Sequence, residues 1–136
     1  MVKVLISDNL SPAAADIFRD RGIEVDVDTK LSVEELHSKI AGYDGLAVRS
    51  ATKATAELIA AADRLRVIGR AGIGVDNIDI AAATQNGVVV MNTPFGNAVT
   101  TAEHAIAMMM AVARQIPAAD QSPQAGKWEK SAFMGA

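Results

Sequence analysis

Short apolar runs alternate with helix-forming segments along the first 91 residues, and this alternation constrains the fold more than any other feature. Such a pattern is typical of parallel strands joined by right-handed helical crossovers. The last run, Val88–Met91, is apolar on both faces, as a sheet covered by helices on both sides requires. The sequence therefore predicts an α/β fold, a flavodoxin-like five-stranded parallel sheet with flanking helices. The predicted strands are 2–7, 23–27, 45–49, 66–70 and 88–91, and the predicted helices are 12–21, 32–40, 55–63 and 79–85.

Several helix ends carry recognisable signals. Ser11-Pro12 predicts a helix start, and Gly22 predicts the end of the same helix. Ser32 and Glu35 have the spacing of a capping box. Thr100 and Glu103 have the same spacing and predict the start of a later helix.

The helix predicted after Thr100 differs from the others, because 105–113 is apolar almost all round and includes three consecutive methionines. A helix without a polar face has to be buried on all sides. It is either the central helix of a single domain, or an interface with a partner subunit or another domain. Residues 117–136 are polar and predicted to be loop-like, with Trp128 and Phe133 as isolated anchors. The expected units are an α/β unit at 1–98 and a long apolar helix with its tail at 99–136.

Composition excludes several classes of protein. The 136 residues contain no cysteine, which excludes a disulfide scaffold, a thiolate metal site and a cysteine nucleophile. With 13 Lys and Arg against 16 Asp and Glu, broad nucleic-acid binding is not expected. The longest apolar run is far shorter than the ~20 residues of a membrane span, and the N-terminus lacks a signal-peptide pattern. We therefore expect a cytoplasmic protein without membrane or nucleic-acid partners.

Two arginines occur at the ends of predicted strands, which is where open α/β sheets bind ligands. Arg49 precedes Ser50, and Arg70 precedes Ala71 and Gly72. A guanidinium can grip a carboxylate or phosphate through two parallel hydrogen bonds. The sequence therefore predicts an anion site, and the alternative is that both arginines form surface ion pairs with acids at helix ends.

Other motifs are weaker. Gly72 and Gly74 begin a pattern that resembles a dinucleotide fingerprint, but Asn77 stands where the third glycine is needed for close packing. We expect a tight turn beside a small ligand rather than a pyrophosphate cradle. His37 and His104 lack a metal-type partner four residues on, and structural roles are expected for both. A receiver-like signalling domain shares the βα plan, but it needs an Asp after the third strand and a Lys after the fifth, where this chain has Arg49 and Asn92-Thr93-Pro94.

Ordered blocks along nearly the whole chain resemble the N-terminal part of the D-isomer-specific 2-hydroxyacid dehydrogenases. The blocks are Leu5–Asp8, Val48–Thr52, Gly69–Asn77, Met91–Asn97, Thr101–His104, Ala113–Pro117 and Gly126–Glu129. The resemblance implies hydride transfer from a 2-hydroxy acid to NAD in a cleft between a substrate domain and a Rossmann domain.

The resemblance also implies roles for individual residues. Arg49 and Ser50 match the phosphate side of the substrate pocket, which implies a small phosphorylated hydroxy acid. Arg70, Ala71 and Gly72 match the loop that faces the substrate carboxylate. Asn97 matches a residue that lines the same cleft, and Ile73 matches a position near the cofactor. The helix from Thr100 matches the crossover that builds a homodimer, which gives 100–117 as the expected interface.

The family's catalytic Arg, Glu and His and its NAD-binding Rossmann domain match nothing in these 136 residues. The expectation is an N-terminal portion of such a dehydrogenase, with no catalytic residue of its own and no activity alone. His104 lies on the wrong element to be the catalytic histidine. The alternatives are a non-catalytic dimerising interaction module and the receiver-like domain.

Overall fold

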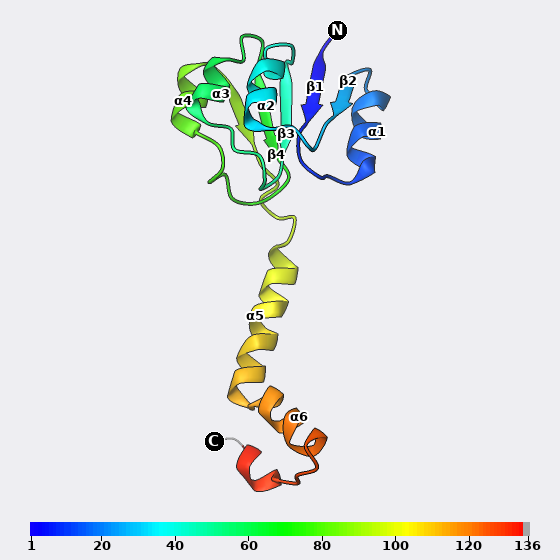
Figure 1. Cartoon of the computed structure of the whole chain (residues 1–136), viewed down its shortest axis with the longest axis vertical. Coiled ribbons are helices and arrows are strands. Elements are labelled where there is room, and N and C mark those ends of the chain that lie inside the picture. The colour runs from blue at the N-terminus through cyan, green and yellow to red at the C-terminus, as the bar shows by residue number, and fades with distance from the viewer. Residues whose placement is uncertain (135–136) are drawn as a thin grey trace. The chain divides into compact units, whose positions relative to one another are not determined.

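The computed structural model describes residues 1–134, and the chain divides into two compact units, Met1–Gly96 and Asn97–Ala136 (Figure 1). The first unit is built on a parallel sheet with the order β2-β1-β3-β4-β5. This is the flavodoxin-like order, so the predicted five-stranded fold is confirmed. The strands are β1 (Lys3–Ile6), β2 (Glu24–Val27), β3 (Gly45–Val48), β4 (Val67–Arg70) and β5 (Val89–Met91). The helices are α1 (Pro12–Asp20), α2 (Val33–Ile40), α3 (Ala56–Ala60) and α4 (Ile80–Gln85).

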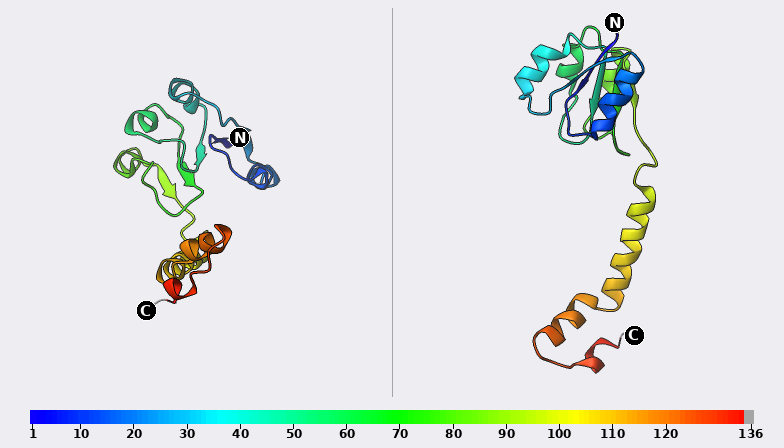
Figure 2. Two further views of the ribbon diagram at one scale, coloured as in Figure 1. Left: turned by 60° about the horizontal axis from the view of Figure 1, so that its bottom comes forward. Right: turned by 90° about the vertical axis from the view of Figure 1, so that its right-hand side faces the viewer.

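The core of this unit lies on both faces of the sheet. Side chains alternate along a strand, so Leu5 packs into one cluster while its neighbours Val4 and Ile6 pack into the other. The larger cluster joins the sheet to α2, α3 and α4, and the smaller one joins it to α1. Figure 2 shows the helices on opposite sides of the strands. Parallel strands covered in this way present their carboxyl ends, and the loops that follow them, along one edge.

The helix-end signals at Ser11-Pro12, Gly22 and Ser32–Glu35 are confirmed, whereas α3 ends at Ala60 and not at the predicted 63. Ser32 Oγ accepts from the Glu35 N–H at 3.2 Å, and Glu35 Oε2 accepts from the Ser32 N–H at 2.8 Å, which completes a capping box. Pro12 lies in the first turn of α1, and Gly22 adopts a φ of +71° just after its end. A left-handed φ is cheap only for glycine, which explains the stop.

The second unit contains α5 (Ala98–Ala113), α6 (Ile116–Gln124) and the 3₁₀ helix η1 (Lys130–Phe133). Two predictions fail here. The helix α5 begins at Ala98 with Asn97 as its N-cap residue, so the capping box expected at Thr100 is wrong. The loop-like tail expected from 117 is also wrong, because Pro117 lies in the first turn of α6, where a missing N–H loses nothing. The remaining two residues of that predicted tail, Gly135 and Ala136, lie outside the described residues.

The long apolar helix exists, but it has no buried residue within the described chain. Half or more of the surface of each of its large apolar side chains is exposed. The helix α5 belongs to the second unit. Among residues 1–134, no helix combines the length and apolar character that crossing a membrane demands.

Candidate functional site

The loops after β1, β3 and β4 meet at the carboxyl edge of the sheet, and Asp8 lies at their centre. Asp8 lies in the loop after β1, two residues beyond the end of the strand, and is only 4% exposed. Its carboxylate accepts hydrogen bonds from the N–H groups of Arg49 at 2.6 Å, Ala51 at 3.1 Å and Thr52 at 3.0 Å. The Thr52 hydroxyl donates to the same carboxylate at 2.6 Å. These bonds fix the backbone of the loop that follows β3.

The ionised form of Asp8 is the stable one in the folded chain. Burial by itself would raise the pKa of this carboxyl, but the hydrogen bonds from the Thr52 hydroxyl and from the backbone of Arg49, Thr52 and Ala51 outweigh it and lower the pKa below its ordinary value. A fixed negative charge therefore lies under the β3 loop, with its oxygens already occupied by donors.

Arg49 and Ser50, both predicted to bind the ligand, lie on this loop and are exposed. Neither the Arg49 guanidinium nor the Ser50 hydroxyl has a hydrogen-bond or ion-pair partner among residues 1–134. The alternative that Arg49 forms a surface ion pair is therefore wrong for the described chain. An unpaired guanidinium beside a free hydroxyl is suited to binding an anion.

Arg70 is placed differently. Its side chain is only 12% exposed, its Nε donates to the carbonyl of Arg49 at 3.0 Å, and its Nη1 donates to the carbonyl of Gly74. The Nη2 atom lies 3.7 Å from Asp76 Oδ1, and this acid belongs to the loop after β4 rather than to a helix end. Much of the Arg70 guanidinium therefore serves to join the two loops.

Asn77 also joins these loops. Its Nδ2 donates to the carbonyls of Arg49 at 2.9 Å and Thr52 at 2.7 Å, while its Oδ1 is buried and has no hydrogen-bond partner among residues 1–134. Sequence reasoning noticed Asn77 only as a departure from the dinucleotide pattern. No local sequence signal indicates that Asn77 joins the two loops by hydrogen bonds, because its partners lie 25 and 28 residues away.

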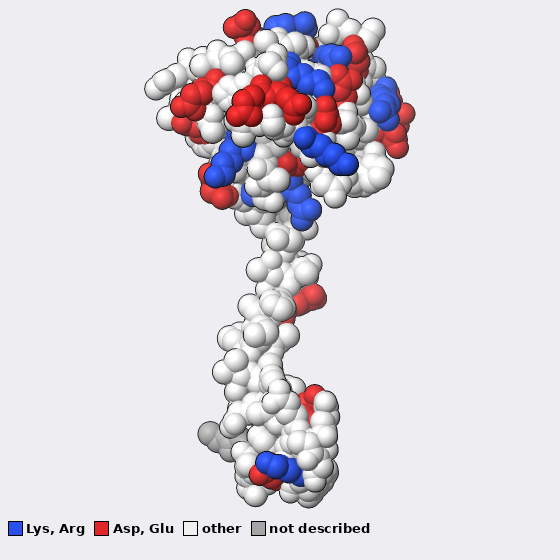
Figure 3. All heavy atoms as spheres, viewed as in Figure 1, with Lys and Arg blue, Asp and Glu red and all other residues white. Residues whose placement is uncertain are grey.

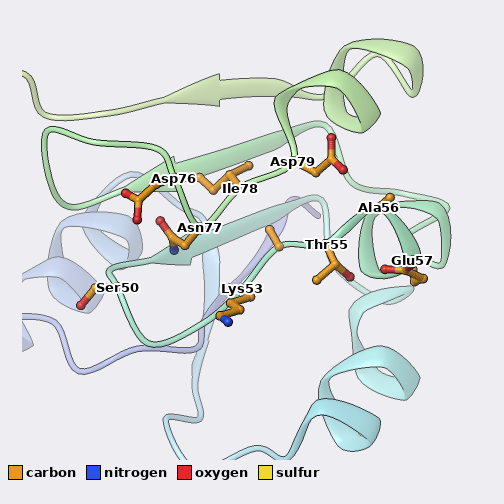
Figure 4. Close-up of a pocket in the computed structure, with 10 residues that line it drawn as sticks. Ser50, Lys53, Thr55, Ala56, Glu57, Asp76, Asn77, Ile78 and Asp79 are labelled. Carbon is orange, nitrogen blue, oxygen red and sulfur yellow. The ribbon is translucent and has the colours of Figure 1, made fainter.

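A cavity of about 580 Å³ opens between the β3 and β4 loops (Figure 4). Ser50 is the predicted site residue that lines it, and Figure 4 shows Lys53 and Asn77 beside the same opening. The complete lining is Ser50, Lys53, Ala54, Thr55, Ala56, Glu57, Asp76, Asn77, Ile78 and Asp79.

The remaining predicted residues are held by their backbones. The Ala71 N–H donates to the Val48 carbonyl at 2.9 Å, which ties the β4 loop to β3. The Gly72 carbonyl accepts from the Thr93 N–H at 3.0 Å. The Ile73 carbonyl accepts from Asn92 Nδ2 at 2.6 Å, and its side chain is 43% exposed. Asn97 belongs to the second unit, as the N-cap residue of α5.

The family follows from comparison with known proteins. Residues 4–129 match the catalytic domain of the D-isomer specific 2-hydroxyacid dehydrogenases. This chain belongs to that family. The membership agrees with the strand order, and it excludes the receiver-like alternative.

Relatives support a narrower group within the family. A D-3-phosphoglycerate dehydrogenase from Archaeoglobus fulgidus is 55% identical over 98% of this chain. The solved structure of NAD⁺-bound 3-phosphoglycerate dehydrogenase from Entamoeba histolytica has 35% identity and a TM-score of 0.71, covering 83% of this chain and 39% of that one. A Thermus thermophilus crystal structure reaches a TM-score of 0.81 at 31% identity, over 98% of this chain and 45% of that one. The chain spans about a quarter of the length of the curated relatives it matches.

NAD-bound relatives raise the question of whether this dehydrogenase-family chain holds a dinucleotide itself. The glycines at 72 and 74 do not open a helix, since α4 begins at Ile80. A Cβ at Gly72 would lie 2.7 Å from Arg70 Nη1, so the space beside this glycine holds a guanidinium. The described residues therefore do not form a pyrophosphate cradle. Residues 1–134 also contain no cluster of side chains that could hold a metal ion.

Proposed function

We propose that this chain is the N-terminal, substrate-binding part of an NAD-dependent D-3-phosphoglycerate dehydrogenase, which oxidises the 2-hydroxy group of 3-phosphoglycerate in serine biosynthesis. The observation that carries the proposal is the unpaired Arg49 guanidinium, exposed beside Ser50 on a loop immobilised by Asp8. The 55% identity to a relative of that name supports the same substrate.

We propose that the phosphate and the carboxylate of the substrate bind to different arginines. Arg49 and Ser50 supply a fork of N–H donors and a hydroxyl, which suit the phosphate group. Arg70 lies on the neighbouring loop, and after its Nε and Nη1 have bonded to carbonyls its Nη2 remains, 3.7 Å from the exposed Asp76 carboxylate that a substrate carboxylate would have to displace. That remaining nitrogen, with the backbone at Ala71 and Gly72, is the proposed contact for the carboxylate.

Substitution of Arg49 tests the phosphate assignment. We expect Arg49→Ala to weaken binding of 3-phosphoglycerate by the 136-residue chain roughly tenfold or more, since a hydrogen bond to a charged group contributes about 1.5–3 kcal/mol. Binding of D-glycerate, which lacks the phosphate, should change much less. Nitrogen-15 NMR titration measures both affinities.

Arg66→Ala is the matched control, because Arg66 is an exposed arginine that precedes β4 at the opposite edge of the sheet. It should bind both ligands as the wild type does. Equal losses for 3-phosphoglycerate and D-glycerate in Arg49→Ala would contradict the phosphate assignment.

We also propose that the 136 residues do not turn over substrate alone. None of them matches the family's catalytic Arg, Glu and His, and electrostatic stabilisation and proton transfer are each typically worth orders of magnitude in rate. The purified chain, mixed with NAD⁺ and 3-phosphoglycerate, should form no NADH above a protein-free blank. Measurable NADH formation that scales with protein concentration would contradict this proposal.

The partner that we propose for the second unit is another copy of the chain, with α5 and the following residues to 117 as the interface. The exposed apolar side chains of α5 support it, since large exposed apolar patches typically mark interaction sites. Figure 3 shows α5 as an almost uninterrupted uncharged surface in that view. The exposed set is Val99, Ile106, Met108, Met109, Met110 and Val112.

A further inference from the structure

Asp8 bonds to the buried side of the loop 49–52, while Arg49 and Ser50 on this loop are exposed. Three of the four residues at 49–52 donate a backbone N–H to this carboxylate, and Ser50 is the exception. The N–H of Ser50 has no hydrogen-bond partner among residues 1–134. Some donors of the loop therefore bond to Asp8. Three others have no partner among residues 1–134, namely the Ser50 N–H, the Ser50 hydroxyl and the Arg49 guanidinium.

We infer that Asp8 is a positioning residue, which fixes the backbone of 49–52 so that Arg49 and Ser50 present these donors to the phosphate group of the substrate. The inference rests on the proposed function, because it takes a phosphate monoester as the ligand. Fixing donors before the ligand arrives removes part of the ordering cost of binding.

The hydrogen bonds from residues 49–52 require a side chain at position 8 that only accepts hydrogen bonds. All the groups that face Asp8 from the loop are donors, and an ionised carboxylate can receive every one of them. An asparagine has the same shape, but its amide nitrogen would face at least one N–H or hydroxyl donor. Asp8→Asn therefore loosens the loop while removing no bulk from the site.

Two variants and a control test the inference on the 136-residue chain. Asp8→Asn replaces one of the two acceptor oxygens by an NH₂ donor, and Thr52→Val removes one donor to Asp8 while keeping the Thr52 backbone N–H. Asp44→Asn is the control, because the Asp44 carboxylate also accepts a backbone N–H, from Lys3 at 2.9 Å, but it precedes β3 at the opposite edge of the sheet. Thr52→Val keeps the test decisive if Asp8→Asn fails to fold.

Amide exchange and ligand titration, both followed by nitrogen-15 NMR, are the measurements. We expect faster exchange at Arg49, Ala51 and Thr52 in Asp8→Asn and Thr52→Val, with the exchange of β3 unchanged. We expect 3-phosphoglycerate to bind Asp8→Asn about tenfold more weakly, which is the loss expected when one hydrogen bond to a charged group is lost. Thr52→Val should lose less, and Asp44→Asn should bind as the wild type does.

The possible failures can be told apart. A wild-type chain that binds 3-phosphoglycerate, with a folded Asp8→Asn variant that binds it equally well, overturns the positioning role and leaves the proposed function standing. Equal weakening by Asp44→Asn also overturns it, because the effect would then be one of general stability. A folded wild-type chain that does not bind 3-phosphoglycerate overturns the proposed function, and this inference with it.

Discussion

At position 72 the absence of a side chain makes room for the Arg70 guanidinium. A Cβ built there would lie 2.7 Å from Nη1 and 3.3 Å from Cζ of Arg70. The guanidinium cannot simply move aside, because it is largely buried and donates to the carbonyls of Arg49 and Gly74. The glycine therefore belongs to the same arrangement that joins the β3 and β4 loops.

We expect Gly72→Ala to lower the free energy of unfolding by about 1–2 kcal/mol, because displacing Arg70 breaks hydrogen bonds made by a charged donor. Urea denaturation measures the change. Gly69→Ala in β4 is the control, since nothing lies within 4 Å of a Cβ there, and it should change stability by less than about 0.5 kcal/mol. In an Arg70→Ala background the penalty of Gly72→Ala should vanish, and a full penalty there would show that the clash is not its cause.

Candidate site residues can be predicted from the sequence only where the signal lies in a short segment. Arg49 and Arg70 can be singled out as candidates from sequence because a charged residue at a strand end is visible in a short segment. The roles of Asp8 and Asn77 were missed, because Asp8 meets its partners across 41 to 44 residues and no local pattern records such a contact. Sequence also could not show that Arg70 is mostly engaged by carbonyls, since this depends on the path of the β4 loop.

Among the elements, the edge strand β2 is held by polar contacts as well as by its ladder with β1. Asp26 of β2 accepts from the Tyr43 hydroxyl at 2.6 Å, and Lys3 of β1 lies 3.0 Å from Asp26 and 2.9 Å from Glu24. Burial and the hydrogen bond to Asp26 raise the pKa of Tyr43 to about 12. The protonated phenol is therefore the form that the fold prefers.

A pH dependence of stability follows for this strand. The contribution of Tyr43 is complete below the ordinary pKa of tyrosine, about 10, and is lost as the pH rises towards the raised value. We expect the stability advantage of wild type over Tyr43→Phe to shrink by ~1 kcal/mol between about pH 9 and about pH 11. Urea denaturation across that range measures it, and comparison with Tyr43→Phe cancels the titration of Lys3, which acts in the same direction. An advantage that stays constant with pH would contradict the assignment.

The elements of the first unit were predictable because their patterns are strong and agree with one another. Short apolar strand runs, a first-turn proline at 12 and a glycine at 22 all indicate the same boundaries. The second unit was harder. The spacing of Thr100 and Glu103 also occurs inside a helix, and Pro117 and Pro123 suggest a loop unless the helix is known to begin at 116. Gln115, with a left-handed φ of +50°, separates α5 from α6, and the break was not predictable because no glycine occurs there.

At the scale of the whole molecule, the two units differ in how they are stabilised. The first has buried clusters on both faces of its sheet, whereas Ser122 is the one buried side chain in the helices of the second unit's described part. Packing of an amphipathic or apolar face supplies most helix stability in proteins. The exposed apolar helix α5 is therefore expected to gain stability from the partner copy that we propose.

We expect Met109→Glu to separate the proposed dimer, because Met109 is 63% exposed and a charge buried without a partner in an interface costs several kcal/mol. Glutamate and methionine have similar helix propensities, so α5 itself should persist. Light scattering across a concentration series should show a dissociation constant raised at least about a hundredfold. Gln121→Glu adds the same charge on α6 and should leave the dimer intact, and a wild-type chain that remains monomeric at high concentration would contradict the proposal.

The contact between Asp8 and residues 49–52 joins positions that the unfolded chain keeps far apart. The proposed anion site therefore requires an intact sheet, and any compound that binds this loop binds the native chain and not the unfolded one. Such a compound adds about 2.7 kcal/mol to the free energy of unfolding at a hundredfold excess over its dissociation constant, and the melting temperature rises accordingly. A thermal-shift screen of phosphorylated acids can therefore rank substrates for this family member without any catalytic assay.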